Sequence, residues 1–70
     1  MQITVNGMQQ EVPSGTNVSQ LLDFLKIPPE RISVEVNLDV LDRKAYHHTS
    51  LREGDRIEII GFVGGGADVG

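Results

Sequence analysis

Residues 51–66 read LREGDRIEIIGFVGGG, which joins a turn, an apolar strand pattern and a run of glycines. The turn is predicted over Arg52–Asp55, where Gly54 is the residue that tolerates a positive φ. The last strand is predicted over Arg56–Val63. Within it, Ile57 and Ile59 are expected to face the core, because alternate residues of a strand share one face.

The opposite face of this strand carries Ile60 and Phe62, and two interpretations of that pair are open. The first is partial burial under a loop, or ordinary scattered surface apolar residues. The second is a surface on which a partner protein docks. After Val63 nothing remains that could form a packed element. We therefore expect a domain over residues 1–63 and a flexible glycine-rich tail over residues 64–70.

The start of the chain predicts a hairpin. Met1–Asn6 alternates apolar and polar residues, which is typical of a half-buried strand. Asn6 and Gly7 tolerate the positive φ of a type I′ turn, so Met8–Val12 is predicted to be the returning strand. The first and last strands have the clearest patterns, and we expect them to lie side by side and parallel at the centre of a sheet.

One helix is predicted next. Asn17 is a favourable N-cap residue, and Gln20 stands three residues later, as in a capping box; Thr16 is an alternative N-cap. The apolar residues that follow have helical spacing: Val18, Leu21, Leu22 and Leu25. Pro28 and Pro29 are expected to end the helix.

The rest of the chain predicts a third strand over Ile32–Val36, a short edge strand over residues 40–42 and one helical turn over residues 44–48. A short amphipathic helix can bury its apolar face only by lying across the sheet. The predicted fold class is therefore α+β, a mixed sheet of four to five strands with one helix packed across it.

The composition excludes several classes of function. The chain has 70 residues, a net charge of −4 and no cysteine. It therefore lacks a disulfide framework and a cysteine-based metal site, and its acidic surface disfavours nucleic acids and anionic membranes. The N-terminal sequence resembles neither a signal peptide nor a membrane span. We expect a cytoplasmic protein that is a monomer when free.

Side chains that often carry catalysis form no recognisable constellation. His47 and His48 are neighbours and point in different directions on any regular element, which makes them a poor chelating pair. Glu35, Asp39 and Asp42 are spread along a strand and a loop, and nothing pairs them for acid and base chemistry. We expect a protein that is not an enzyme and that binds no metal or cofactor itself.

The glycine run has a chemical interpretation beside that of an ordinary frayed chain end. Gly64, Gly65 and Gly66 have no side chains, so they could thread a narrow channel in another enzyme and deliver a terminal carboxylate. A phosphate-binding loop is a poorer alternative, because no helix follows whose N-terminus could hold the anion.

The chain resembles the ThiS family, the ubiquitin-like sulfur carriers of thiamin biosynthesis. The similar segments cover nearly the whole chain: residues 5–7, 18–25, 34–37, 51–59 and 62–66. The turn and last strand are shared with other β-grasp domains, and the glycine run makes the resemblance more specific.

The resemblance implies a β-grasp fold and a carrier role. In this family a ThiF-like enzyme uses ATP to adenylate the C-terminal glycine, sulfur replaces the adenylate to leave a thiocarboxylate, and a ThiG-like thiazole synthase takes the sulfur. ATP and its metal ion are then expected on the adenylating partner. The sulfur-carrying end is expected at Gly65 and Gly66. Partner contacts are expected at Ile60, Phe62, Val63 and Gly64.

The family's glycine pair normally ends the chain, whereas here Ala67–Gly70 follows. An amide within the chain cannot be adenylated, so we hypothesise that a protease removes these four residues and exposes Gly66. Two alternative functions stay open: a MoaD-like sulfur carrier for molybdopterin or cysteine synthesis, and a β-grasp interaction module whose tail does no chemistry.

Overall fold

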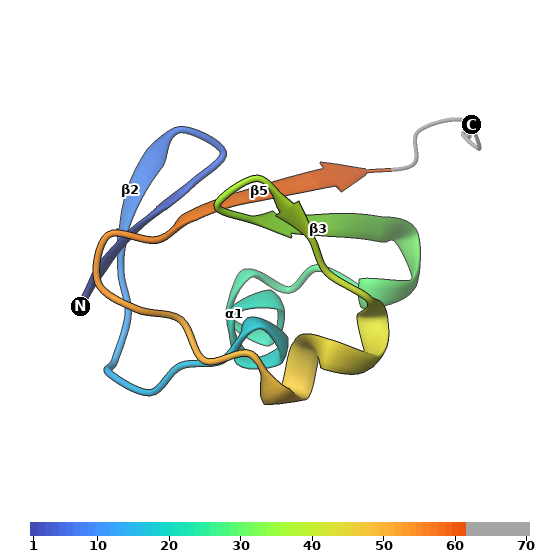
Figure 1. The fold of residues 1–70 in the computed structure, drawn as a ribbon, viewed down its shortest axis with the longest axis horizontal. Coiled ribbons are helices and arrows are strands. Elements are labelled where there is room, and N and C mark those ends of the chain that lie inside the picture. Colours follow the sequence, from blue (N-terminus) through green and yellow to red (C-terminus); the bar gives the residue numbers. More distant parts are fainter. Residues whose placement is uncertain (62–70) are drawn as a thin grey trace.

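The computed structural model describes residues 1–61, which form one mixed sheet, one α-helix and two short 3₁₀ helices (Figure 1). The strands are β1 (Gln2–Val5), β2 (Met8–Glu11), β3 (Ile32–Val36), β4 (Asp39–Val40) and β5 (Arg56–Gly61). The helices are α1 (Val18–Leu25), η1 (Pro29–Arg31) and η2 (Arg43–His48).

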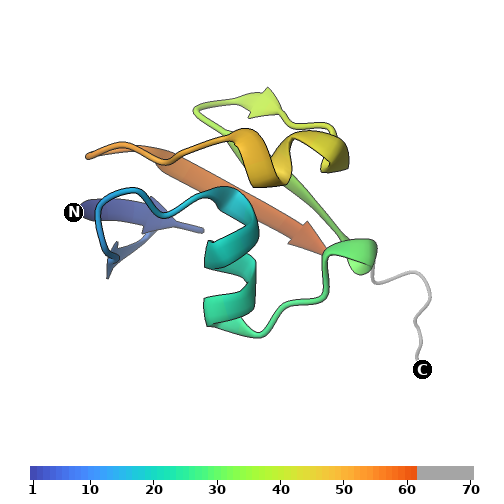
Figure 2. The ribbon, with the colours of Figure 1, turned by 90° about the horizontal axis from the view of Figure 1, so that it is seen from below.

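The sheet has the strand order β2-β1-β5-β3-β4, so β5 lies at its centre. The β1–β5 pair is parallel, and the other three pairs are antiparallel. The predicted central, parallel pairing of the first and last strands is confirmed. Figure 2 shows α1 crossing one face of this sheet, which is the predicted α+β arrangement.

The predicted N-terminal hairpin is confirmed, and its turn has the expected geometry. Asn6 and Gly7 have φ values of 50° and 82°, as a type I′ turn requires. β1 then buries Ile3 and Val5 on one face, because the two residues are separated by one position of the strand.

The predicted capping box at the start of α1 is also confirmed. The Asn17 side-chain oxygen accepts from the Gln20 N–H at 2.8 Å, and the Gln20 side-chain oxygen accepts from the Asn17 N–H at 2.9 Å. The helix ends at Leu25, the last residue of its apolar spacing and before the limit that Pro28 and Pro29 set. Lys26 adopts a left-handed φ of 59°, and the Ile27 N–H donates to the Leu22 carbonyl at 2.9 Å. A Schellman-type cap therefore closes the helix before Pro28.

The segment after β3 differs slightly from its prediction. The edge strand is Asp39–Val40 rather than residues 40–42, and the helical turn begins at Arg43. The reason is the tight reversal at Asn37 and Leu38, which both have positive φ. It places Asp39 directly opposite Val36, so pairing starts one residue earlier.

The core lies between α1 and the sheet. Its buried residues are Ile3, Val5, Val12, Val18, Leu21, Leu22, Val34, Tyr46, Leu51 and Ile57. Within residues 1–61 no polar or charged residue falls in this buried class. Tyr46 and Leu51 were not predicted, because residues 38–51 have no apolar periodicity. Tertiary packing brings η2 against α1 and buries Tyr46.

Candidate functional site

The end of the central strand β5 is the described part of the site predicted from the sequence. Ile57 is fully buried, and Ile59 packs against the core. Ile60 keeps 47% of its surface exposed on the opposite face. The predicted alternation along this strand is confirmed, and it places an apolar side chain in solvent three residues after a buried one.

The sheet register shows which side chains surround Ile60. Residues directly opposite each other on paired strands share a face. Ser33 of β3 lies opposite Ile60, and Glu35 lies opposite Glu58. Val40 of the edge strand lies opposite Glu35 and is 68% exposed. The face of the sheet that α1 does not cover therefore combines two carboxylates with two exposed apolar side chains.

The exposure of Val40 was not predicted from the sequence. Its exposure could have been inferred from the predicted short edge strand, because a strand at the edge of a sheet leaves part of its side chains in solvent. β4 has two residues, and both are exposed. Leu38, in the reversal just before it, is 75% exposed. The sequence placed neither residue near Ile60, since the β3–β4 register was needed to bring Val40 onto the same face.

Carboxylates outnumber the cation Arg56 among the charged residues of β3 and β5 on this face. Glu35 and Glu58 occupy directly opposite positions, and like charges in that arrangement destabilise a sheet. Across residues 1–61 the ion pair present joins the Met1 ammonium to Glu11 at 3.3 Å, and it does not involve either carboxylate. Arg56 shares this face with Glu58 and Ile60, so Glu35 and Glu58 together leave an excess of one negative charge beside Ile60, which suits a basic group on a partner.

Two asparagine side chains bond to the backbone of β5, one near each end. At the start, the Asn37 oxygen accepts from the Arg56 N–H at 2.9 Å, and its amide donates to Asp55 at 3.0 Å. Towards the end, the Asn6 oxygen accepts from the Ile59 N–H at 2.7 Å, and its amide donates to the Ile59 carbonyl at 3.3 Å. The sequence pattern predicts Asn6 as a turn residue and gives no sign of this second role.

The other titratable candidates lie apart from β5 or have structural roles. His47 and His48 are exposed on η2, as expected for solvated residues. Asp42 accepts from the Lys44 N–H at 3.0 Å and so caps η2. In the part of the chain that the structure describes, no group of three His, Cys, Asp or Glu side chains is arranged to hold a metal ion. No helix in that same part is long and apolar enough to cross a membrane.

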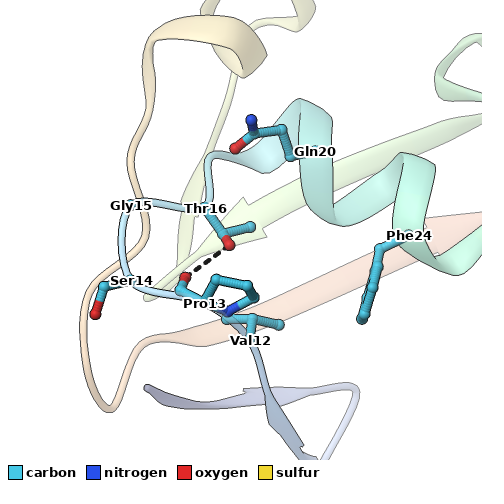
Figure 3. Close-up of a pocket in the computed structure, with 7 residues that line it drawn as sticks. All are labelled: Val12, Pro13, Ser14, Gly15, Thr16, Gln20 and Phe24. Carbon is cyan, nitrogen blue, oxygen red and sulfur yellow. Dashed lines mark hydrogen bonds between the residues drawn. The ribbon is translucent and has the colours of Figure 1, made fainter.

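A hollow of about 310 Å³ lies between α1 and the loop that precedes it (Figure 3). Phe24 lines one side and is 65% exposed, while Val12 and Pro13 line another. The Thr16 hydroxyl in its wall already donates to the Pro13 carbonyl at 2.7 Å. The lining residues include no carboxylate, histidine or cation, so this hollow offers shape but no acid or base chemistry.

The remaining residues of the predicted site lie outside the described residues: Phe62, Val63, Gly64, Gly65 and Gly66. Their predicted roles in partner binding and sulfur transfer therefore stay predictions. The structure positions the segment before them, a central strand whose last residue is Gly61.

Comparison with known proteins gives a match to the model of the ThiS family over residues 2–66. The sulfur carrier protein ThiS of Bacillus subtilis is 30% identical over 66 residues, which cover 94% of this chain and 98% of that protein. A thiazole synthase of Paramagnetospirillum magneticum is 31% identical over 68 residues. That match covers 97% of this chain, but this chain spans only 21% of the length of the synthase.

The fold has a close structural counterpart. The crystal structure of the thiamine biosynthesis protein ThiS from Geobacter metallireducens superposes with a TM-score of 0.83 at 40% identity. The match covers 94% of this chain and all of that one. These findings confirm the β-grasp fold and the family resemblance that the sequence predicted.

Proposed function

The chain belongs to the ThiS family, and from that membership we propose that it is a sulfur carrier of thiamin biosynthesis with its acyl end at Gly66. The observation that carries the proposal is the extent of the family match, which continues through the glycine run and ends at Gly66. A carrier of this kind is a substrate of its partner enzymes rather than a catalyst.

The names of the similar proteins favour thiamin over the other sulfur pathways. A curated relative is named as a sulfur carrier ThiS, a structural counterpart as a thiamine biosynthesis protein, and two further relatives as thiazole synthases. None of these names concerns molybdopterin or cysteine synthesis, so the MoaD-like alternative has no specific support here.

The proposed chemistry takes place at the Gly66 carboxylate. The carboxylate attacks the α-phosphorus of ATP on an adenylating partner, which forms an acyl-adenylate and releases pyrophosphate. A sulfur nucleophile supplied by the partner system then displaces AMP and leaves a thiocarboxylate. Adenylation is needed because a carboxylate is a poor electrophile without a good leaving group. ATP and its metal ion are bound by the partner in this proposal.

Thiazole synthase is the proposed recipient of the sulfur. The relatives named thiazole synthase contain a segment similar to this chain in about a fifth of their length. A carrier-like segment and a thiazole synthase can therefore belong to one polypeptide, which supports a working contact between the two.

The proposed docking surface is the face of β5 opposite α1. Ile60 and Val40 are its exposed apolar residues, and the facing carboxylates Glu35 and Glu58 lie beside Ile60. An adenylating partner that fits this surface presents an apolar contact and a basic side chain, since opposite charges steer association and fix orientation. Phe62 and Val63, with Gly64, continue the proposed contact towards the acyl end.

Adenylation at Gly66 requires a free carboxylate, and Ala67 follows Gly66 in this chain. We therefore propose hydrolysis of the Gly66–Ala67 peptide bond, in which water adds across the amide and the segment from Ala67 onward leaves. Three further properties of this chain remain predictions. They are its division into a domain over residues 1–63 and a tail over residues 64–70, its cytoplasmic location, and its monomeric state when free.

The test is ATP–pyrophosphate exchange with the adenylating enzyme of the same organism. The chain ending at Gly66 should support exchange, and the 70-residue chain should not. A sulfur donor should then replace one oxygen by sulfur in the intact mass of the shorter chain. If the shorter chain supports no exchange, the interaction-module alternative is favoured. If the 70-residue chain acquires the sulfur at Gly70, the carrier role holds and the hydrolysis is wrong.

A further inference from the structure

We propose that Asn6 is a positioning residue, whose side chain fixes the end of β5 that precedes the proposed carrier segment. This inference rests on the proposed carrier function. Asn6 lies in the β1–β2 turn, fifty-three positions away from Ile59 in the chain, and the fold places that turn beside β5 (Figure 1). Its side chain binds both backbone groups of Ile59.

The side chain continues a strand pairing that the backbone of β1 abandons. The parallel register of β1 and β5 ends with Val5 opposite Ile57. The Asn6 N–H still donates to the Ile57 carbonyl at 2.9 Å, and then the chain turns away. The carboxamide of Asn6 supplies the next donor and acceptor, at 3.3 Å and 2.7 Å from the Ile59 oxygen and nitrogen.

The backbone groups of Ile59 have no substitute partner on the β3 side. Alternate residues of an antiparallel pair direct their N–H and C=O groups away from the partner strand. Ile59 lies opposite Val34, whose carbonyl is engaged by the Leu41 N–H at 2.9 Å. Without the Asn6 carboxamide, the end of β5 would be held by β3 alone.

These two hydrogen bonds act close to the proposed docking and carrier residues. Ile59 immediately precedes the proposed docking residue Ile60 and stands five residues before Gly64. If the strand end frays, the orientation of Ile60 is lost and the point at which the chain leaves the sheet moves. Each residue released adds up to about 3.3–3.6 Å of reach. A partner channel of fixed depth therefore needs this strand end to be fixed.

Asn37 provides a matched control. It too is a turn asparagine with positive φ, 52° against 50° for Asn6, and its side chain likewise makes two hydrogen bonds at β5. Those bonds hold Arg56 and Asp55 at the opposite end of the strand. Replacing either asparagine by glycine keeps the positive φ accessible and removes two bonds.

The first measurement is amide hydrogen exchange on the 70-residue chain and on its Asn6→Gly and Asn37→Gly variants. We expect the Ile59 amide to exchange at least about tenfold faster in Asn6→Gly than in Asn37→Gly, since a hydrogen bond is worth roughly one factor of ten. Amides of the buried strand β1 should exchange alike in the two variants. Equal protection of Ile59 in both variants would overturn the proposal, whatever the function.

The second measurement separates positioning from stability. In ATP–pyrophosphate exchange with chains ending at Gly66, we expect Asn6→Gly to raise KM for the carrier roughly three- to tenfold with kcat unchanged. Asn37→Gly should leave both constants near those of the unsubstituted chain. Equal KM values for the two variants would refute the positioning role. Failure of the unsubstituted chain to support exchange would instead refute the proposed function, and the Ile59 exchange rate would still decide whether Asn6 holds the strand end.

Discussion

Ile57 and Ile60 lie on the same strand and occupy opposite faces of the sheet. Ile57 is fully buried between the sheet and α1, and Ile60 is 47% exposed on the other face. The same substitution, Ile→Ala, at the two positions therefore compares a core contact with a surface contact. Both positions are in β5, so the difference in loss reports mainly how deeply each side chain packs on its own face of the strand.

The expected loss at each position follows from the burial. Truncation of isoleucine to alanine removes three carbon atoms, worth about 2.4 kcal/mol of transfer free energy when all are buried. At Ile57 the cavity left behind raises the loss in unfolding free energy to about 3–4 kcal/mol. At Ile60 about half of the transfer term applies and no closed cavity forms, so the loss is about 1 kcal/mol.

The consequence for folding is large, because a domain of this size has a net stability of roughly 3–5 kcal/mol. Ile57→Ala should be partly unfolded at room temperature, whereas Ile60→Ala should remain folded with its Tm lowered by about 4–8 °C. Thermal and urea unfolding followed by circular dichroism measures both. Equal losses of unfolding free energy in the two variants, with the same slope of that free energy against urea concentration, would refute the assignment of Ile60 to the exposed face.

Three further predictions concern single positions. Asn17→Ala removes the N-cap of α1 and should lower the unfolding free energy by about 1 kcal/mol in urea titration; an unchanged midpoint would contradict the capping role. Gly54→Ala places a side chain at φ +83° and should lower the unfolding free energy by about 1 kcal/mol or more. Gly61→Ala adds a Cβ that meets nothing within 4 Å and should change the unfolding free energy by less than about 0.5 kcal/mol. Similar losses of unfolding free energy in the two variants would exclude backbone strain at Gly54 as the cause. Phe62→Ala should weaken binding to the adenylating enzyme, measured by calorimetry, by more than it weakens folding, and equal losses would mean that Phe62 belongs to the core.

Local patterns were sufficient wherever one residue type satisfies one local requirement. Asn6 and Gly7 tolerate positive φ, so the hairpin was predictable. Asn17 and Gln20 satisfy free N–H groups at a helix start, so the capping box was predictable. The end of α1 at Leu25 agrees with the last residue of its apolar spacing, but the left-handed cap could not be predicted, because it falls on Lys26, a residue type with no preference for that conformation.

In the candidate site, too, local features could be predicted from the sequence and contacts between strands could not. The exposure of Ile60 and the burial of Ile57 followed from alternation along one strand, which is a local property. The neighbours of Ile60 could not be predicted, because Glu35 and Val40 reach its face through the register of two strand pairs. Register depends on where the chain reverses, and here the reversal uses Leu38 at a positive φ that its type does not signal.

Sequence alone therefore determined the hairpin, α1, β3 and β5, the buried faces of β1 and β5, and the family to which the glycine run points, but not η1 or the limits of β4 and η2. Tertiary structure decided which distant groups meet. Asn6 and Ile59 are the clearest case, since a turn asparagine serves a second strand only after that strand has packed beside it. The physical reason is that backbone hydrogen bonds at a strand end can be satisfied by any neighbour of suitable geometry, and the fold selects that neighbour.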